Sequence, residues 1–182
     1  MCWVIIAVII SKISSRELLR NWVVVCLANL VGAAGLALLV FLSGHAELNG
    51  GAIGRTVFKI ALAKQGLPWQ EAFFRGVLCN LLVCMAVWMA MAGRSVIDKA
   101  VAIVFPVSAF VAAGFEHSIA NMYLMPLAWL LQHAGAVPPA PVISGAGMLG
   151  NWLPVIAGNL LGGSVLVALT YHVIYRRGPA AP

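Results

Sequence analysis

Two side chains that can carry charge stand next to each other inside an apolar stretch of the sequence. Residues 110–126 read FVAAGFEHSIANMYLMP, so Glu116 and His117 interrupt a run that is otherwise almost free of polar groups. Imidazole gains and loses a proton near neutral pH, and a neighbouring carboxylate favours its charged form. In a non-polar setting, such a pair either offers charge and a proton to a passing solute or forms a buried, mutually satisfied pair.

The overall composition is that of an integral membrane protein. Of the 182 residues, 63% are hydrophobic and 9% are charged, and the mean hydropathy is +1.01. The net charge of +6 comes from single basic residues scattered between apolar blocks, without the basic stripe of a nucleic-acid-binding protein. The four cysteines form no C-x-x-C pair, and no metal site is expected. We therefore expect one transmembrane domain over residues 1–182, surrounded by a lipid bilayer, with no nucleic acid partner.

The lengths of the apolar blocks predict which segments cross the bilayer, because about 20 apolar residues span its core. Three blocks are long enough for one helix each: residues 22–42, 72–92 and 152–175. Residues 1–11 reach only partway across and are predicted as a half-helix. Two further blocks are too short alone but make one crossing together over 100–131, with GFEHS between them. This pattern predicts a broken helix with Glu116 and His117 at the break.

The connections between the blocks are predicted as loops. Residues 43–68 form one long connection in which TVFKIALAK has helical periodicity, and an interfacial helix and a plain surface helix fit it equally. Residues 134–150 are rich in Pro and Gly, which is typical of a loop.

An internal echo relates two of the predicted helices. ANLVGA at 28–33 and GNLLGG at 158–163 place an asparagine before small residues, at matching depth in helices that run in opposite directions. An inverted-topology repeat predicts such a match, and it makes residues 1–11 the second half of another broken helix whose partner is missing from the chain. The small residues favour close helix packing.

Polar residues near the break outline a possible route for a small anion. A monovalent anion loses its hydration in an apolar pore, and the cost falls when it meets positive charge and accepts a proton, which His117 can supply. Phe110 lies about two helical turns before His117 on the same face, where an apolar constriction and simple packing fit equally. Lys64 is expected at the outer mouth. Three asparagines inside the predicted helices must avoid lipid, by lining the pore or by bonding between helices: Asn29, Asn80 and Asn159.

These stretches resemble the formate/nitrite transporter family, and its formate channels in particular. The similarity lies in GFEHSIANMYLMP, NLLVC-x-AVWMA, GRSVIDKA and GNLLGG, and it covers nearly the whole chain. It implies an all-α membrane protein, an aquaporin-like helical bundle with inverted repeats and broken helices, assembled as a homopentamer in the bacterial inner membrane.

The resemblance also implies a function and a set of roles. The function is transport of formate or a similar small monovalent anion, linked to a proton through the central histidine, with no chemical conversion and no cofactor. The pore histidine is His117 and the constriction is Phe110. The electrostatic lure for the anion lies around Lys64, Asn80 and Glu116, and the paired helix asparagines are Asn29 and Asn159.

The chain departs from the family pattern at its start. Family members begin with one further helix, half of another, and a loop whose threonine faces the pore histidine, whereas this sequence has no Thr before Thr56. We therefore expect an N-terminally truncated chain. Three alternatives follow: a nitrite or hydrosulfide channel of the same family, a non-conducting membrane fragment, and a haem or quinone subunit that uses His117, His133 and His172. The last is disfavoured because no two of these histidines share a helix at similar depth.

Overall fold

The computed structural model describes residues 14–170 and 173–174, and the regular structure within them is helical. The elements are α2 (Ser15–Leu42), the 3-10 helix η1 (His45–Glu47), α3 (Leu48–Gln65), α4 (Trp69–Ala92), α5 (Val96–Ala112), α6 (Ser118–His133), α7 (Gly145–Leu160) and the π-helix η2 (Leu161–Leu169), which continues α7. The predicted half-helix at 1–11 and residues 171, 172 and 175 of the predicted helix at 152–175 lie outside the described residues.

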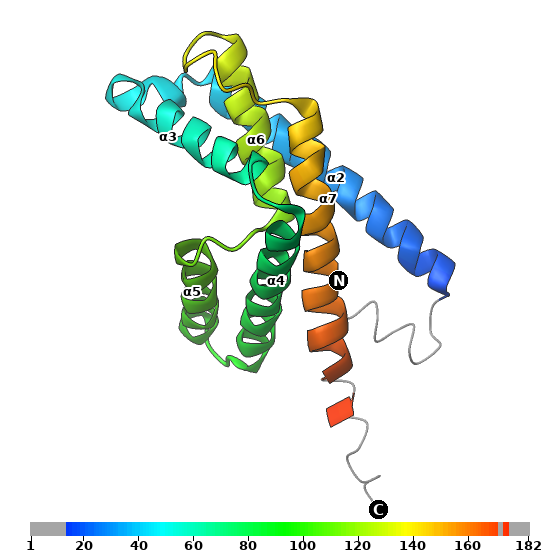
Figure 1. Ribbon diagram of the computed structural model, residues 1–182. Helices are drawn as coiled ribbons and strands as arrows, with labels where there is room; N and C mark the ends of the chain where they lie inside the picture. The colour runs from blue at the N-terminus through cyan, green and yellow to red at the C-terminus, as the bar shows by residue number, and fades with distance from the viewer. Residues whose placement is uncertain (1–13, 171–172, 175–182) are drawn as a thin grey trace, which may run out of the picture.

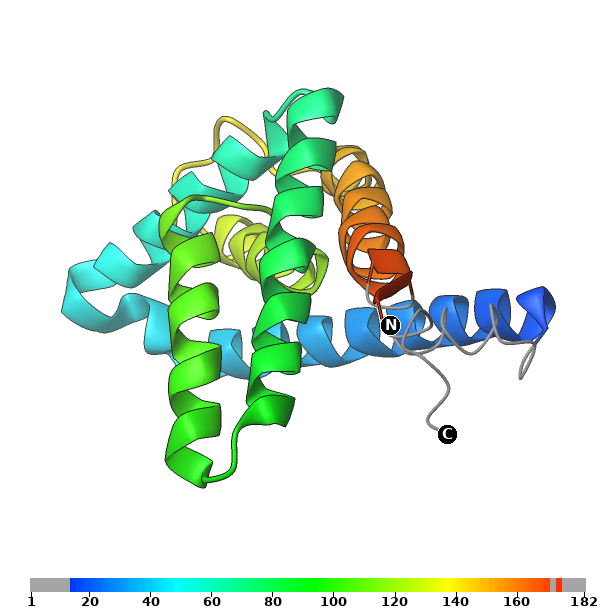
Figure 2. The same cartoon turned by 90° about the horizontal axis from the view of Figure 1, so that it is seen from below.

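The helices form one bundle with a protruding hairpin. Figure 1 shows the α4–α5 hairpin at one end of the molecule and α3 with α6 at the other. Helix α6 packs between α2 and α3, and α4 packs along α7 and η2. Seen from below, α5 stands at the edge of the bundle, where it packs mainly on α4 (Figure 2). The buried apolar core lies between α2, α3, α6 and α7.

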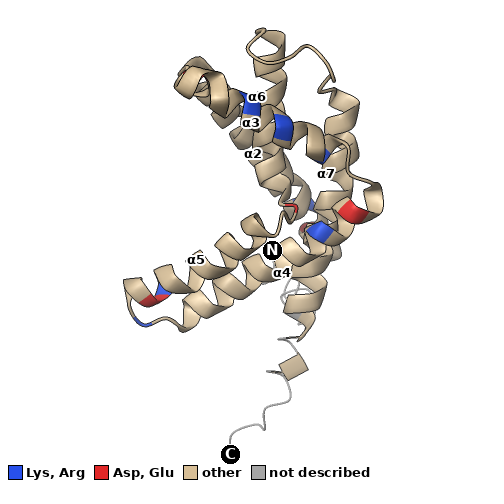
Figure 3. Cartoon of the chain, turned by 60° about the vertical axis from the view of Figure 1, so that its left-hand side comes forward, with Lys and Arg blue, Asp and Glu red and all other residues tan. Residues whose placement is uncertain are grey.

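The outer surface of the bundle is apolar. Three helices are long and apolar enough to cross a membrane: Ser15–Leu42, Trp69–Ala92 and Gly145–Val167. Only 11% of the most apolar window of the first is buried within the chain. Charged residues gather at the α4–α5 turn, along α3 and at the start of α4, and most of the helical ribbon carries no charged residue (Figure 3). An apolar surface of this extent requires lipid or neighbouring protein to cover it.

Capping residues explain why two helices begin earlier than their apolar blocks. At the start of α2, the Glu17 N–H donates to Ser14 Oγ (3.2 Å) and the Ser14 N–H donates to Glu17 Oε2 (2.7 Å). Ser95 and Asp98 form the same reciprocal box before α5. Because the capped first turn of each helix is polar, a prediction from apolar blocks does not include it. The structure therefore begins these helices at Ser15 and Val96, where the apolar blocks begin at residues 22 and 100.

The helical periodicity of TVFKIALAK at 56–64 is confirmed by α3, while the loop predicted for residues 48–55 and for the end of 134–150 was wrong. Helix α3 has 18 residues and buries Gly54, Phe58 and Ala61, so it belongs to the core and does not lie only on a surface. Helix α7 already begins at Gly145, because Ser144 Oγ accepts a hydrogen bond from the Gly147 N–H (3.0 Å) and caps the helix.

Glycines allow α4 and α7 to approach each other closely. A Cβ atom at Gly158 would overlap the carbonyl oxygen of Phe73, and one at Gly162 would overlap that of Val77. At Gly76 a Cβ would lie 2.9 Å from the carbonyl oxygen of Val155. The predicted packing role of the small residues at 158–163 is confirmed for this contact. It brings the backbones of α4 and α7 together beside the break between α5 and α6.

Replacing Gly158 by Ala tests this contact. Because the added methyl group meets backbone atoms that cannot rotate away, α4 and α7 must separate, and we expect a loss of about 1–3 kcal/mol in stability. Thermal unfolding in detergent measures the effect. Gly35→Ala is the matched control, since no atom lies within 4 Å of its Cβ position. Equal melting temperatures for the two variants would contradict the packing argument.

Candidate functional site

The site is built around an elbow, residues 113–117, that separates α5 from α6. Gly114 adopts a left-handed backbone conformation (φ +66°) that glycine reaches without strain. No atom lies within 4 Å of its Cβ position, so the backbone angle, and not a lack of space, favours glycine there. The chain changes direction at this point, and α6 does not continue the line of α5 (Figure 1).

The backbone groups released by the break are bonded by neighbouring helices. The Glu116 N–H donates to the carbonyl oxygen of Arg75 in α4 (3.3 Å). The Asn159 amide donates to the carbonyl oxygens of Glu116 (3.0 Å) and Gly76 (2.8 Å), and its Oδ1 accepts from the Ser118 N–H (3.0 Å). One buried side chain of α7 therefore joins the elbow to both α4 and α6. These bonds supply partners for the Glu116 and Ser118 main chain, as a helix interrupted away from water requires.

His117 caps the first turn of α6. Its Nδ1 accepts a hydrogen bond from the Ala120 N–H (3.4 Å), and its ring stacks on Phe110 with centroids 5.9 Å apart and planes 21° apart. A neutral ring nitrogen that accepts a hydrogen bond carries no proton, so this bond assigns the proton to Nε2. The imidazole is half-buried and held at two sides, with Nε2–H as its remaining donor.

A cavity of about 100 Å³ opens beside His117. It is lined by Trp22, Cys26, Asn29, Asn80, His117, Ser118, Ile119, Met122, Ile156, Asn159 and Leu160. A larger open groove of about 490 Å³ lies between α2 and α6 and shares His117, Asn29 and Ile119 with the cavity. The imidazole therefore borders both spaces. Asn80 also donates from Nδ2 to the main-chain carbonyl oxygen of Asn159, which fixes that wall of the cavity.

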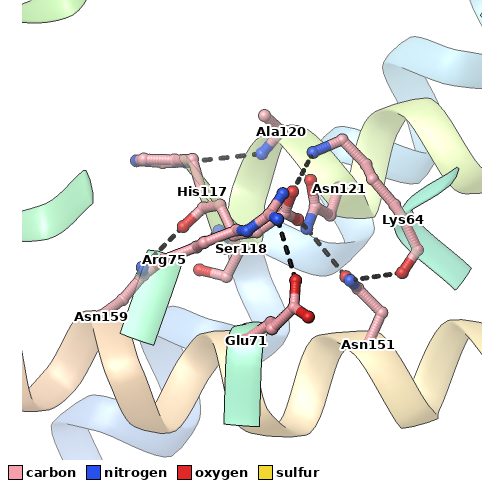
Figure 4. A network of polar contacts seen from close by, with 10 residues as sticks. Lys64, Glu71, Arg75, His117, Ser118, Ala120, Asn121, Asn151 and Asn159 are labelled. Atoms are coloured by element: carbon pink, nitrogen blue, oxygen red, sulfur yellow. Dashed lines mark hydrogen bonds and ion pairs between the residues drawn. The ribbon is translucent and has the colours of Figure 1, made fainter. Parts of the chain in front are cut away.

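Glu116 belongs to a separate polar cluster on the other side of the elbow. Its Oε1 pairs with Lys64 Nζ (2.8 Å) and its Oε2 accepts from Asn121 Nδ2 (2.6 Å). The Glu116 side chain is 3% exposed and that of Lys64 is 15% exposed. Figure 4 shows Lys64 and Asn121 facing each other, with His117 directed away from them.

The structure groups the predicted site residues differently from the sequence analysis. Asn29, Asn80, Asn159 and His117 line one cavity, and Phe110 stacks on His117. Lys64 and Glu116 form an ion pair, while Asn80 donates to the Asn159 carbonyl oxygen, so the three residues share no hydrogen-bonded cluster. The Lys64 side chain is mostly buried, and its expected place at the outer mouth of a pore stays a prediction.

The expected influence of Glu116 on the charge of His117 is also not supported by the contacts. His117 has extended backbone angles (φ −106°, ψ 117°), and in extended backbone successive side chains point to opposite sides. The carboxylate is bonded to Lys64 and Asn121, both on the side away from the imidazole. Glu116 and His117, although adjacent in sequence, therefore lie in different surroundings.

Sequence reasoning missed two asparagines of the Glu116 cluster. Asn121 follows the break in GFEHSIAN and is fully buried, and Asn151, which is 2% exposed, lies in a stretch that composition assigned to the end of a loop or the edge of an apolar block. The rule that singled out Asn29, Asn80 and Asn159 applies equally to Asn121, so the signal was present there. For Asn151 it was hidden by the glycines and proline around it.

Possible cofactor ligands are dispersed. Within the described ranges, no group of three or more His, Cys, Asp or Glu side chains could hold a metal ion. His117 caps the first turn of α6 and His133 ends the helix, which separates them by roughly 24 Å at 1.5 Å per residue. His172 lies outside the described residues. These two histidines cannot share one haem.

Taken together, a helical bundle with an apolar exterior, a helix broken at a glycine elbow and a mostly apolar cavity beside the break, bordered by three asparagines and His117, defines an all-α membrane channel fold. A solved pentameric formate channel with formate bound has the same fold: the TM-score is 0.82 at 35% identity, covering 91% of this chain and 69% of that chain. The sequence model described as Formate/nitrite transporter matches residues 1–173. The chain belongs to the formate/nitrite transporter family.

Two curated relatives come from Escherichia coli strain K12. Formate channel FocA is 41% identical over 187 residues, which cover 94% of this chain and 66% of the relative. Nitrite transporter NirC is 41% identical over 145 residues, which cover 80% of this chain and 51% of the relative. The chain thus spans less than two thirds of the length of these relatives. They are channels and transporters and not enzymes, which agrees with the predicted class.

The bonds of Asn159 lead to a stability prediction. Asn159→Ala leaves two carbonyl oxygens and one N–H without their side-chain partner in a buried place, and we expect a loss of about 2–4 kcal/mol. Asn29→Ala is the matched control, because Asn29 lines the same cavity but makes no hydrogen bond within the described part of the chain. Thermal unfolding of both variants in detergent measures the difference, and an equal loss would show that the elbow does not depend on Asn159.

Proposed function

We propose that the protein is a multi-pass channel or transporter of the cell inner membrane for formate or a similar small monovalent anion, and that the anion passes His117. One observation carries the proposal. The imidazole, held by the cap of α6, borders a cavity lined by three asparagines inside an otherwise apolar bundle. Membership of the formate/nitrite transporter family supplies the class of substrate.

The cavity has the groups that a desolvated anion needs. An anion that leaves water for an apolar interior loses several kcal/mol of hydration unless fixed donors replace it. The Asn29 amide, the second N–H of the Asn80 amide and the Nε2–H of His117 are such donors, whereas both hydrogens of the Asn159 amide are used at the elbow. A second ring proton goes to Nδ1 only when the cap bond from the Ala120 N–H is released, and the doubly protonated imidazole then adds positive charge or transfers its proton to a weak-acid anion. We infer that this exchange links the anion to a proton.

Two further residues have proposed roles along the pathway. Phe110 stacks on the imidazole and narrows the apolar approach to it. Lys64 is paired with Glu116 but keeps 15% of its side chain exposed, and we infer that it contributes positive potential to the anion from behind the elbow. The ion pair offsets the cost of burying that charge.

We propose that the chain works as part of a homopentamer. Helix α5 buries only Pro106 within the chain, while Val96, Ile97 and Phe105 are at least 72% exposed. In the proposed pentamer, neighbouring protomers and lipid together cover this exposed apolar surface of α5. The solved relative described as a pentameric formate channel supports this assembly.

Nitrite is the second candidate substrate. The Escherichia coli nitrite transporter NirC is as identical to this chain, at 41%, as the formate channel FocA, although over a shorter stretch. Both anions are small and monovalent, and hydrosulfide shares these properties. Competition of nitrite or hydrosulfide with labelled formate in the same liposomes distinguishes the three.

Replacing His117 by Phe tests the central role. The change keeps a flat ring for stacking on Phe110 but removes both nitrogens, so the titrating group and the donor are lost. We expect flux of formate in liposomes to change its selectivity over larger anions or to lose its dependence on pH between about 5 and 8.

His133→Phe is the matched control for this experiment. It makes the same chemical change at the other end of α6, where the imidazole bonds to the Trp129 carbonyl oxygen (2.8 Å). We expect its pH profile to follow that of the unmodified protein. Identical flux of the His117→Phe variant and the unmodified protein at every pH would remove the proposed role of His117.

A further inference from the structure

Asn151 in α7 closes a ring of polar contacts around Glu116. Its Nδ2 donates to the carbonyl oxygen of Lys64 (2.9 Å), and its Oδ1 accepts from Asn121 Nδ2 (2.8 Å). The same Asn121 amide donates to Glu116 Oε2 (2.6 Å), and Lys64 Nζ pairs with Glu116 Oε1 (2.8 Å). Figure 4 shows Lys64, Asn121 and Asn151 meeting on one side of the elbow.

The ring joins the end of α3 and the start of α6 to the middle of α7. Lys64 is in the last turn of α3, where carbonyl oxygens have no partner within the helix, and Asn121 is in the first turn of α6. Asn151 and Asn159 lie about two turns apart on the same buried face of α7. Thus one face of α7 holds the elbow at two points. Asn159 bonds the elbow backbone, and Asn151 acts on the charged side chain of Glu116 through Asn121 and the Lys64 main chain.

The contacts of Asn121 depend on Asn151 for their direction. Both hydrogens of the Asn121 amide are used, one on Glu116 and one on Asn151, while its Oδ1 is buried without a hydrogen-bond partner in the described part of the chain. Rotating the amide by half a turn would place that oxygen against the carboxylate of Glu116. The bond from the Asn121 amide to Asn151 Oδ1 therefore favours the same amide orientation that bonds Glu116.

We propose that Asn151 is a positioning residue for anion transport: it holds the Lys64–Glu116 pair in place by bonding the Lys64 main chain and orienting Asn121. The inference rests on the proposed function. Asn151 itself is not among the residues that line the cavity beside His117. Its effect on the anion is indirect, through the position of the Lys64 charge.

The test measures one substitution, Asn151→Ala, in two backgrounds. Asn151→Ala is measured in the unmodified protein and in the Glu116→Gln variant, as formate flux in liposomes over a range of formate concentrations and pH. We expect Asn151→Ala to raise the concentration for half-maximal flux by about tenfold in the unmodified background and to change it little beside Glu116→Gln. A residue with only a structural role would have the same effect in both backgrounds, and this outcome overturns the proposal.

Gln65→Ala is the matched control. Gln65 is the neighbour of Lys64 and also makes two bonds between α3 and the segment before α7, to the Val142 carbonyl oxygen and from the Ser144 N–H (both 3.0 Å). It bonds neither Glu116 nor Asn121. We expect its half-maximal concentration to stay that of the unmodified protein, and a tenfold change there would mean that any loosening of the end of α3 has the effect.

Two further measurements keep the outcome clear. If Asn151→Ala does not fold, Asn121→Ala removes the same link from the other side, and it must show the same dependence on Glu116. If the unmodified protein carries no formate, nitrite or hydrosulfide, the proposed function fails. If the unmodified protein conducts and both asparagine variants conduct with unchanged concentration and pH dependence, the positioning role alone fails.

Discussion

The structure depends on how a helix can be interrupted away from water. Each N–H or C=O group left without a partner in a non-polar interior costs several kcal/mol, so a break is stable only where side chains or neighbouring backbones replace the lost bonds. Asn159 and the Arg75 carbonyl oxygen meet this requirement at the elbow. The close approach of α4 and α7, made possible by Gly158 and Gly162, brings these partners within reach.

The elbow presents its two ionisable side chains to different surroundings. Glu116 points into a dense cluster where each carboxylate oxygen has a donor, and His117 points to a space large enough for a small solute. The cluster is rigid because every side chain in it is bonded to another element of the fold. Within residues 14–170, the imidazole is held by the cap of α6 and by the Phe110 ring. One short segment therefore combines an anchored charge with an accessible proton-carrying group.

Much of this arrangement could be predicted from sequence because membranes impose simple rules. The lengths of the apolar blocks and the polar residues between two short ones indicated the broken helix and placed His117 beside it. The helical periodicity of TVFKIALAK indicated part of α3, but the length and burial of this helix were missed because it is only moderately apolar and packs on α6, which hydropathy does not consider. The separation of Lys64 from Asn80 could not be predicted, since it depends on which way successive side chains of the elbow turn. Asn151 was missed because its role depends on residues far away in sequence.

The anchoring of the elbow on α4 has a consequence for evolutionary drift. The partners that α4 provides are the carbonyl oxygens of Arg75 and Gly76, which every amino acid possesses. The side chain at position 75 can therefore be exchanged during divergence without removing the attachment. Position 76 is restricted for a different reason, because a Cβ there would press on the Val155 backbone. Homologous chains can thus vary much of α4 and still keep the same bend.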